Sequence, residues 1–235
     1  MRGGRAAALV AFVAWIALSA AHAPAADPVQ SPRGVRYVTL IRHGIYDRVD
    51  SLDDRTANGL NALGREQARI VGQRLAGLPV RPRLLVSSDL KRARETAAEI
   101  GLALSMSAGE DSLLSECTPP SSRPGLDQEQ DAAEMARCLT QLGAAWEKYF
   151  RPSPDGDAQD VLVCHGNVIR WFVNRALGAD VRNWTSLDIA NASLTIIAVA
   201  PSGSTRLVLY SDVGHLPLAK QTWAGRGPGW TKPAK

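Results

Sequence analysis

Two short segments, residues 40–44 and 163–167, constrain this chain most strongly, because each ends an apolar run with a histidine followed by glycine. Each run has the length of a buried strand, so His43 and His165 are expected where two strands stop. In open α/β sheets, ligands bind in the crevice outside the carboxyl ends of the strands. Two histidines at that edge can therefore converge on one ligand, and the glycines allow a sharp turn and a close approach by that ligand.

The composition suits one soluble domain and excludes a nucleic-acid-binding protein. A chain of 235 residues can bury a core without help from metals or disulfides. Residues 1–26 contain two of the 27 basic residues and no acidic residue, which leaves 25 basic against 23 acidic residues, a formal charge of +2. With so small a charge and no block of lysine and arginine, the chain lacks a footprint for a phosphate backbone.

The amino terminus has the layout of a secretory signal peptide. Arg2 and Arg5 precede an apolar stretch of 16 residues, 6–21, and a run of small residues follows. The stretch is short for a membrane span of about 20 residues. We therefore expect a signal peptide at 1–26, a linker at 27–34, and a periplasmic or secreted protein. The alternative is an uncleaved anchor facing out of the cytoplasm, the only case in which a membrane would be a partner.

Hydrophobic periodicity predicts alternating strands and helices. Strands are expected at 35–41, 84–86, 160–164, 194–200 and 206–210, the last two as a hairpin. Helices are expected at 61–76, from about 90 to 100, at 127–150 and at 168–177. Asn61 can cap the first helix, and Ser87, Ser88 and Asp89 supply cap chemistry for the second.

This order predicts an α/β fold, a three-layer α/β/α sandwich with a mostly parallel mixed sheet and a C-terminal hairpin. The domain is expected to cover residues 35–225, with a flexible tail at 226–235. Residues 110–126 are rich in proline and small polar residues and predict a surface loop. Loops of that length usually carry function or disorder.

The three cysteines allow one disulfide. An exported chain can oxidise two of them, and Cys117 with Cys138 is the plausible pair because Cys164 lies in the apolar run of a central strand. The alternative, which the sequence favours, is that all three are buried or inert thiols.

Two arginines are expected at the same rim as the histidines: Arg42 at the end of the first strand and Arg92 at the start of the helix after the second. The planar fork of arginine matches phosphate oxygens bidentately, and a helix amino terminus also favours an anion. Glu116, in the proline-rich loop, could deliver a proton to a departing oxygen. No close-spaced ligand pair such as HExxH or CxxC is present, so no metal or other cofactor is expected.

These motifs resemble those of the histidine phosphatases, the superfamily that includes cofactor-dependent phosphoglycerate mutase. The signature Arg-His-Gly stands at 42–44, the helix phrase Leu-Gly-Arg-Glu-Gln-Ala at 63–68, the second arginine motif at 87–97 and the second histidine at His165. The four motifs occur in the family's order over residues 35–175. The segment that follows His165 is most similar to the branch that contains a mitochondrial serine/threonine protein phosphatase.

The resemblance implies a phosphomonoester hydrolase. His43 would be the nucleophile that forms a phosphohistidine, Arg42, Arg92 and His165 would bind the phosphate, and Glu116 would protonate the leaving alcohol. The substrate would be a phosphoprotein or a small phosphorylated metabolite. The alternative is a catalytically silent module of the same fold that binds a phosphate or a partner. Oligomeric state stays open.

This chain departs from the family pattern near the signature. Many members carry an asparagine shortly after Arg-His-Gly, whereas Ile45, Tyr46 and Asp47 follow here, so Tyr46 is expected to shape the entrance. The surroundings of Glu116 match the branch only loosely. His215 is expected in a solvent-facing loop, and Trp171, Phe172 and Trp184 in the core.

Overall fold

The structure, a computed structural model, describes residues 34–223. The expected signal peptide at 1–26, almost all of the linker and the tail at 226–235 lie outside the described residues. Within the described part, no helix is both long and apolar enough to cross a membrane.

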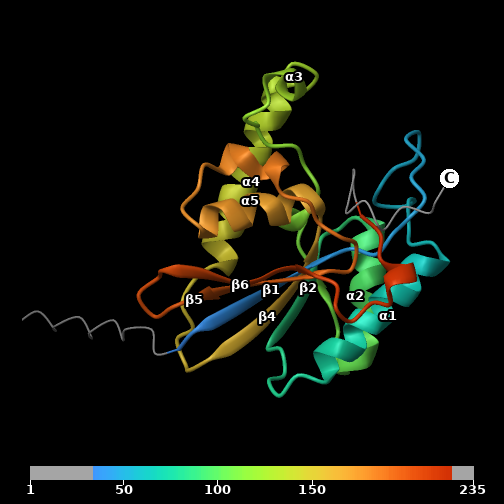
Figure 1. The fold of residues 1–235 in the computed structure, drawn as a ribbon, viewed down its shortest axis with the longest axis vertical. Helices are drawn as coiled ribbons and strands as arrows, with labels where there is room; N and C mark the ends of the chain where they lie inside the picture. The colour runs from blue at the N-terminus through green and yellow to red at the C-terminus, as the bar shows by residue number, and fades with distance from the viewer. Residues whose placement is uncertain (1–33, 224–235) are drawn as a thin grey trace, which may run out of the picture. The chain divides into compact units, whose positions relative to one another are not determined.

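A six-stranded sheet lies at the centre of the fold, with the strand order β3-β2-β4-β1-β5-β6 (Figure 1). The strands are β1 (Arg36–Arg42), β2 (Leu84–Ser87), β3 (Gly109–Glu110), β4 (Ala158–Cys164), β5 (Leu194–Val199) and β6 (Thr205–Asp212). Strands β3, β2, β4 and β1 run parallel, β5 pairs with β1 antiparallel, and β6 completes the hairpin. The predicted mostly parallel mixed sheet with a C-terminal hairpin is confirmed.

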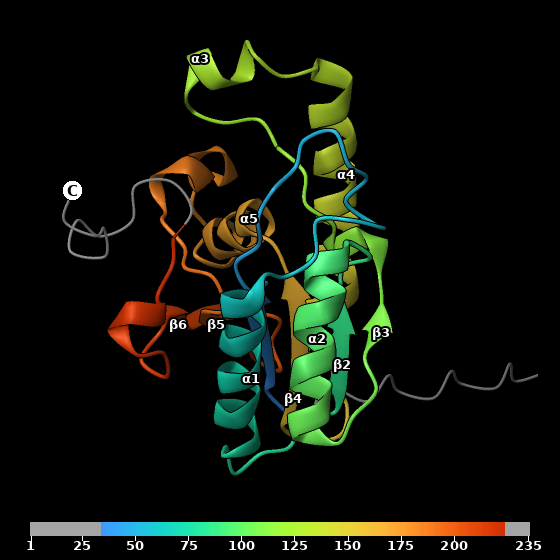
Figure 2. The same ribbon diagram turned by 90° about the vertical axis from the view of Figure 1, so that its right-hand side faces the viewer.

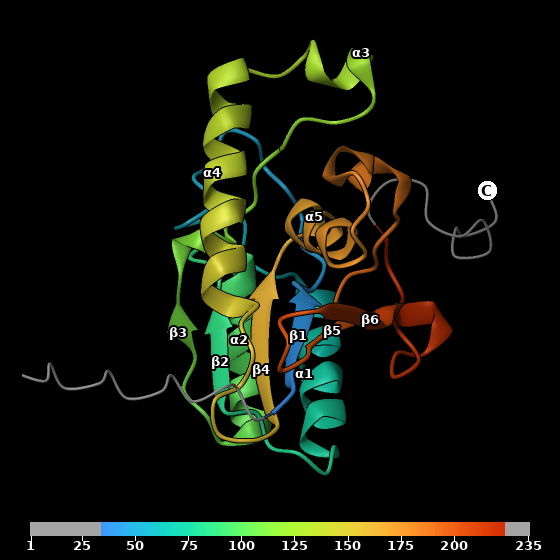
Figure 3. The same cartoon turned by 90° about the vertical axis from the view of Figure 1, so that its left-hand side faces the viewer.

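Four helices cover the two faces of this sheet. Helices α1 (Ala62–Ala76) and α2 (Lys91–Leu104) lie in front of the sheet in Figure 2, and α4 (Ala132–Tyr149) and α5 (Gly166–Ala176) lie in front of it from the opposite side in Figure 3. The shorter helical segments are α3 (Pro124–Asp127), η1 (Ser112–Leu114), η2 (Val181–Ser186) and η3 (Leu218–Lys220). The three-layer sandwich predicted from the sequence is therefore present.

The two layers have separate cores because successive side chains of a strand point to opposite faces. In β1, Val38 and Leu40 pack with α4 and α5, whereas Ile41 packs with α1 and α2. The expected core aromatics Trp171, Phe172 and Trp184 are buried. The central strands are covered on both faces, which explains their nearly continuous apolar runs.

A side-chain cap explains where helix α1 begins. The side chain of Asn61 accepts a hydrogen bond of 2.9 Å from the Gly64 amide, as predicted for α1. Helix α2, in contrast, begins after Leu90 and has no side-chain cap, so the predicted capping role of residues 87–89 is wrong. The Ser88 hydroxyl accepts from the Leu90 amide just before the helix, and the side chains of Ser88 and Asp89 also contact segments distant in the sequence.

The segment 110–126 is more ordered than its prolines predict. It contains η1 and the start of α3, while Pro119 and Pro120 stay irregular and their carbonyls accept hydrogen bonds from the Trp184 indole at 3.2 and 3.1 Å. Helix α4 begins at Ala132 rather than at 127 because Asp131 caps it, accepting from the Glu134 amide at 2.8 Å.

Cys117 and Cys138 form a disulfide, so the favoured expectation of three inert thiols is wrong. The bridge joins the segment after η1 to helix α4. Cys164 is free and buried in β4, and burial raises the pKa of its thiol. The disulfide therefore links the loop that carries Glu116 to helix α4.

Candidate active site

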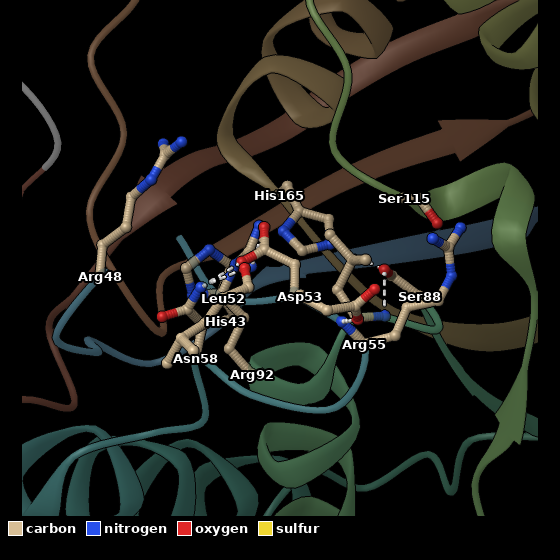
Figure 4. Close-up of polar contacts among 12 residues, drawn as sticks. His43, Arg48, Leu52, Asp53, Arg55, Asn58, Ser88, Arg92, Ser115 and His165 are labelled. Atoms are coloured by element: carbon tan, nitrogen blue, oxygen red, sulfur yellow. Dashed lines mark hydrogen bonds and ion pairs between the residues drawn. The ribbon is translucent and has the colours of Figure 1, made fainter. Parts of the chain in front are cut away.

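The two histidines lie next to each other because β1 and β4 are parallel neighbours in register, with Arg42 opposite Cys164. The backbone amide of His43 donates to the Cys164 carbonyl at 3.0 Å, and the ring centroids of His43 and His165 are 5.0 Å apart (Figure 4). The two residues are 3% and 0% exposed. Both therefore lie at the carboxyl edge of the sheet. We call the part of the site formed by His43 and His165 at this edge the floor.

His43 is held as a neutral imidazole with one free nitrogen. Its Nδ1 lies 2.8 Å from the Gly44 carbonyl oxygen, which can only accept, so Nδ1 carries the proton and Nε2 carries the lone pair. Burial lowers the pKa of His43 well below its usual value, and the charges of Arg42 and Arg92 lower it further. At neutral pH this residue is therefore a neutral imidazole with the lone pair of Nε2 available.

Ser88 orients the second histidine. Its hydroxyl lies 2.8 Å from His165 Nε2 and accepts a hydrogen bond of 3.1 Å from the Leu90 amide. The hydroxyl proton is then available to His165 Nε2, which leaves the proton of the imidazole on Nδ1. Burial, followed by His43 and the two arginines, keeps the pKa of His165 well below its usual value. His165 thus presents Nδ1–H as a neutral donor.

Arg42 and Arg92 are also fixed at this edge. Arg42 Nη1 donates to the Ile189 carbonyl at 2.8 Å, and burial lowers the pKa of Arg42 to about 10. Arg92 pairs through Nη1 with Asp54 at 2.9 Å, and its guanidinium carbon lies 4.7 Å above the Tyr46 ring. The two guanidinium groups bring positive charge to His43.

Several buried nitrogens in the described part of the chain have no hydrogen-bond partner, and four of them lie at this edge: Arg42 Nε, Arg92 Nε, Arg92 Nη1 and His165 Nδ1. Arg92 Nη1 is in an ion pair with Asp54, but without hydrogen-bond geometry. Buried polar groups in native structures are almost always paired, so unpaired ones need an explanation. An anion with several acceptor oxygens would satisfy these nitrogens beside the free Nε2 of His43, so the arrangement can accept a tetrahedral oxyanion.

Glu116 is half-buried in the loop above this floor. Its Oε1 accepts a hydrogen bond of 3.2 Å from the Asn167 amide in the first turn of α5. Burial raises the pKa of Glu116, although Arg42, Arg170 and Arg92 oppose the shift. A carboxyl whose pKa is raised beside cationic groups can hold and release a proton, which suits a general acid.

The segment around Glu116 is fixed from two sides. The Asn167 side chain donates to the Cys117 carbonyl at 3.0 Å, and its own oxygen accepts from Arg170 at 2.5 Å. On the other side, the disulfide joins Cys117 to Cys138. The backbone beside Glu116 is thus attached to both α5 and α4.

The glycines after the histidines have different roles. A Cβ at Gly44 would lie 2.5 Å from the carbonyl oxygen of Gly64, so this glycine allows contact with α1 rather than the expected approach of a ligand. A Cβ at Gly166 would lie 3.5 Å from Arg42 Nε. Only the second glycine therefore keeps space beside the anion donors.

The structure brings all five predicted site residues to this edge. Tyr46 also lies there, with its ring centroid 5.4 Å from that of His43. His215 lies outside this group and is half-buried rather than solvent-facing, with Nε2 3.0 Å from the Ala192 carbonyl. In residues 34–223, no group of three or more His, Cys, Asp or Glu side chains is arranged to hold a metal ion.

Sequence reasoning missed four residues of the site, which are Asp54, Ser88, Asn167 and Arg170. Ser88 was interpreted only as a capping residue. Asn167 and Arg170 are three residues apart in the first turns of α5, and this spacing indicates that they share one face of the helix. Asp54 has no local signal, because its contact with Arg92 depends on how the loop folds.

A family model described as the histidine phosphatase superfamily, branch 1, matches residues 38–161 and 134–213. The chain is 34% identical over 194 residues to the serine/threonine-protein phosphatase Pgam5, mitochondrial, of Drosophila pseudoobscura pseudoobscura, covering 80% of this chain and 66% of that protein. The Xenopus laevis protein of the same name is 31% identical over 194 residues, with coverage of 80% and 70%. The chain thus spans 66% of the length of the first relative.

Two solved structures are similar at 26% identity. One is phosphoglycerate mutase from Plasmodium falciparum, with a TM-score of 0.55 and coverage of 79% of this chain and 96% of that chain. The other is the mycobacterial glucosyl-3-phosphoglycerate phosphatase in complex with VO3, with a TM-score of 0.55 and coverage of 75% and 99%. Both likenesses agree with the α/β sandwich.

The relatives also correct one expectation. The prediction of a periplasmic or secreted protein is wrong, because the similar phosphatases are named as mitochondrial proteins. That prediction depended on residues 1–26, which lie outside the described part of the chain. The resemblance read from the motifs is confirmed: this chain belongs to the histidine phosphatase superfamily, branch 1.

Proposed function

We propose that this chain hydrolyses phosphate monoesters through a phosphohistidine on His43, and that residues 35–225 form the phosphatase domain. One observation carries the proposal: Arg42, Arg92 and His165 have buried partnerless nitrogens at the same sheet edge as a neutral histidine with a free Nε2. A phosphate group supplies oxygens for these nitrogens and places phosphorus in front of the nucleophile. Phosphatase relatives of the same family support it.

In the first step, Nε2 of His43 attacks phosphorus in line while the bond to the ester oxygen breaks. Glu116 transfers its proton to that departing oxygen, so the alcohol leaves neutral. In the second step, the Glu116 carboxylate takes a proton from water as the water oxygen attacks phosphorus. The bond between phosphorus and His43 then breaks, which releases orthophosphate and restores both residues.

Arg42, Arg92 and His165 stabilise the charge on the three equatorial oxygens during both steps. Their geometry is fixed before substrate arrives, by Ile189, Asp54 and Ser88. Preorganised donors of this kind need no reorganisation when charge develops, and losing one typically costs about 10²–10³ in kcat.

The raised pKa of Glu116 suits substrates whose leaving group needs a proton, so we propose an alkyl phosphate rather than an activated ester. The ester would belong to a phosphoprotein or to a small phosphorylated metabolite. Relatives named as serine/threonine-protein phosphatases support the first, and the similar glucosyl-3-phosphoglycerate phosphatase supports the second.

A panel of phosphoserine and phosphothreonine peptides, sugar phosphates and phenyl phosphate tests this proposal on the purified chain. We expect turnover that survives EDTA, because arginines supply the positive charge. Binding of orthophosphate or vanadate without turnover of any ester would instead identify the silent binding module. Loss of activity with EDTA and its return with zinc or magnesium would identify a metallophosphatase.

A further inference from the structure

The geometry points to Asp54 as a positioning residue that holds Arg92 ready to bind phosphate, an inference that rests on the proposed function. Asp54 contacts only one end of the guanidinium, Nη1, at 2.9 Å. Neither Nη1 nor Nε of Arg92 has a partner in hydrogen-bond geometry among the described residues, so the contact with Asp54 is an ion pair. The carboxylate therefore leaves part of the fork free for phosphate oxygens while fixing its plane against the Tyr46 ring, 4.7 Å away.

Arg92 needs such a partner because its side chain is only 4% exposed, whereas that of Asp54 is 37% exposed. A buried charge without a partner is costly, and it stays in place only when paired and hydrogen-bonded. Asp54 supplies this pairing from the rim. Arg42, by comparison, is held by the neutral Ile189 carbonyl, so Arg92 is the arginine that is paired with a charged side chain.

Asp54 is itself anchored independently of Arg92. The Asn58 amide donates to its second carboxylate oxygen at 2.6 Å, and its backbone carbonyl accepts from the Lys91 amide at 2.9 Å. Asn58 is 8% exposed, has a positive φ of 53° that asparagine tolerates, and accepts from the Val49 amide at 2.9 Å. Figure 4 shows Asn58 on the loop beside Arg92 and His43.

These anchors argue against a gate in which Asp54 competes with phosphate and swings away. Leaving Arg92 would also break the contacts of Asp54 with Asn58 and Lys91. Burial alone would raise the pKa of Asp54, but hydrogen bonds from Asn58 and Arg92 keep it below its usual value, so the carboxylate is charged at neutral pH. Asp54 is thus a fixed, charged support behind Arg92.

The test is calorimetric titration of the purified full chain with inorganic phosphate, which needs no turnover. Asp54→Ala is expected to weaken phosphate binding roughly tenfold or more, the size of a hydrogen bond between charged groups. Asp54→Asn retains an acceptor and should recover part of that loss. Asp50→Ala, which removes an exposed ion pair with Arg48 on the same loop, is the matched control and should bind phosphate as the wild type does.

Coupling to Arg92 separates positioning from a general effect on the loop. In an Arg92→Ala background, Asp54→Ala should change phosphate affinity by less than about twofold, because the group that it positions is gone. Equal losses in both backgrounds would overturn the inference. Tighter phosphate binding by Asp54→Ala would also overturn it and would show competition.

The same titrations keep the inference distinct from the proposed function. If Arg92→Ala alone leaves phosphate affinity unchanged, Arg92 does not bind phosphate and both the assigned pocket and the role of Asp54 are wrong. If Arg92→Ala weakens binding while Asp54→Ala and Asp54→Asn do not, only the role of Asp54 is wrong.

Discussion

The floor of the site and the loops above it are built differently. On the floor, the backbone amide of His43 is hydrogen-bonded to Cys164, and the ring of His165 is fully buried. Above it, Asp54 and Glu116 are half-buried and belong to loops fixed by a few side-chain contacts and one disulfide. Sheet register therefore places His43, whereas tertiary contacts place Glu116 and Asp54.

The two regions are linked at Asp89. Its carboxylate accepts a hydrogen bond of 2.7 Å from Arg55 in the first loop and one from the Ser115 hydroxyl next to Glu116. The loops are thus attached to the turn that carries Ser88, whose hydroxyl contacts His165.

Replacing Glu116, in the loop, should give the largest loss of catalytic rate without a loss of phosphate binding by the floor. Glu116→Gln removes the proton donor, so hydrolysis of an alkyl phosphate should fall by about 10²–10⁴, the usual contribution of general acid catalysis. Phenyl phosphates with electron-withdrawing substituents need little protonation and should lose much less. Steady-state rates across a series of leaving groups measure this, and Glu110→Gln, an exposed change in β3, is the control.

An equal loss on good and poor leaving groups would mean that Glu116 is not the acid. A loss of orthophosphate affinity in Glu116→Gln would mean instead that this loop belongs to the phosphate-binding floor, which would break the proposed division.

In the pH profile of activity, the acid limb should depend on His43 in the floor and the alkaline limb on Glu116 in the loop. Because the pKa of His43 is lowered, by burial first and by Arg42 and Arg92 next, activity should persist below pH 6.5, where an ordinary histidine becomes protonated. Because the pKa of Glu116 is raised, the protonated acid is lost as the pH rises through that value. On this alkaline limb kcat/KM for an alkyl phosphate should fall about tenfold per pH unit.

Glu116→Gln should remove the alkaline limb and leave the acid limb in place. An alkaline limb that survives in this variant would have to come from another group, and the assignment of Glu116 would be wrong.

The smallest expected effect concerns the disulfide. Replacing Cys117 and Cys138 together by serine should lower the free energy of unfolding by about 3 kcal/mol, typical for a loop of this length. Turnover of alkyl phosphates should fall a few-fold because the loop beside Glu116 is less restrained, while orthophosphate affinity stays unchanged. Denaturant unfolding and titration measure the two effects. A dithiol should reproduce them in the wild type and do nothing to the double variant.

The floor could be predicted from sequence because its signals are local. Apolar runs mark the strands, His43 and His165 follow them directly, and parallel strands bring their carboxyl ends to one edge. The contacts of Ser88 and Asp54 could not be predicted, because they join segments 77 and 38 residues away, at His165 and Arg92. The sequence around Ser88 has no signal that its hydroxyl will contact His165.

The disulfide shows the same limit. The sequence identified Cys117 and Cys138 as the plausible pair, yet the pairing depends on the loop returning to α4, with Cα atoms 5.6 Å apart. The cap of α1 was predicted correctly because Asn61 and the Gly64 amide are three residues apart. Local chemistry is therefore predictable, and the folding of the loops above the floor is not.

The central claim is that His43 becomes covalently phosphorylated, and an alkaline quench during turnover tests it most directly. Phosphohistidine survives base and is hydrolysed by mild acid. The account predicts one phosphate per chain, stable in alkali, released by mild acid, mapped to His43, and absent from His43→Ala together with turnover. An adduct that maps to Ser87 or Cys164, or a His43→Ala variant with wild-type turnover, would contradict it.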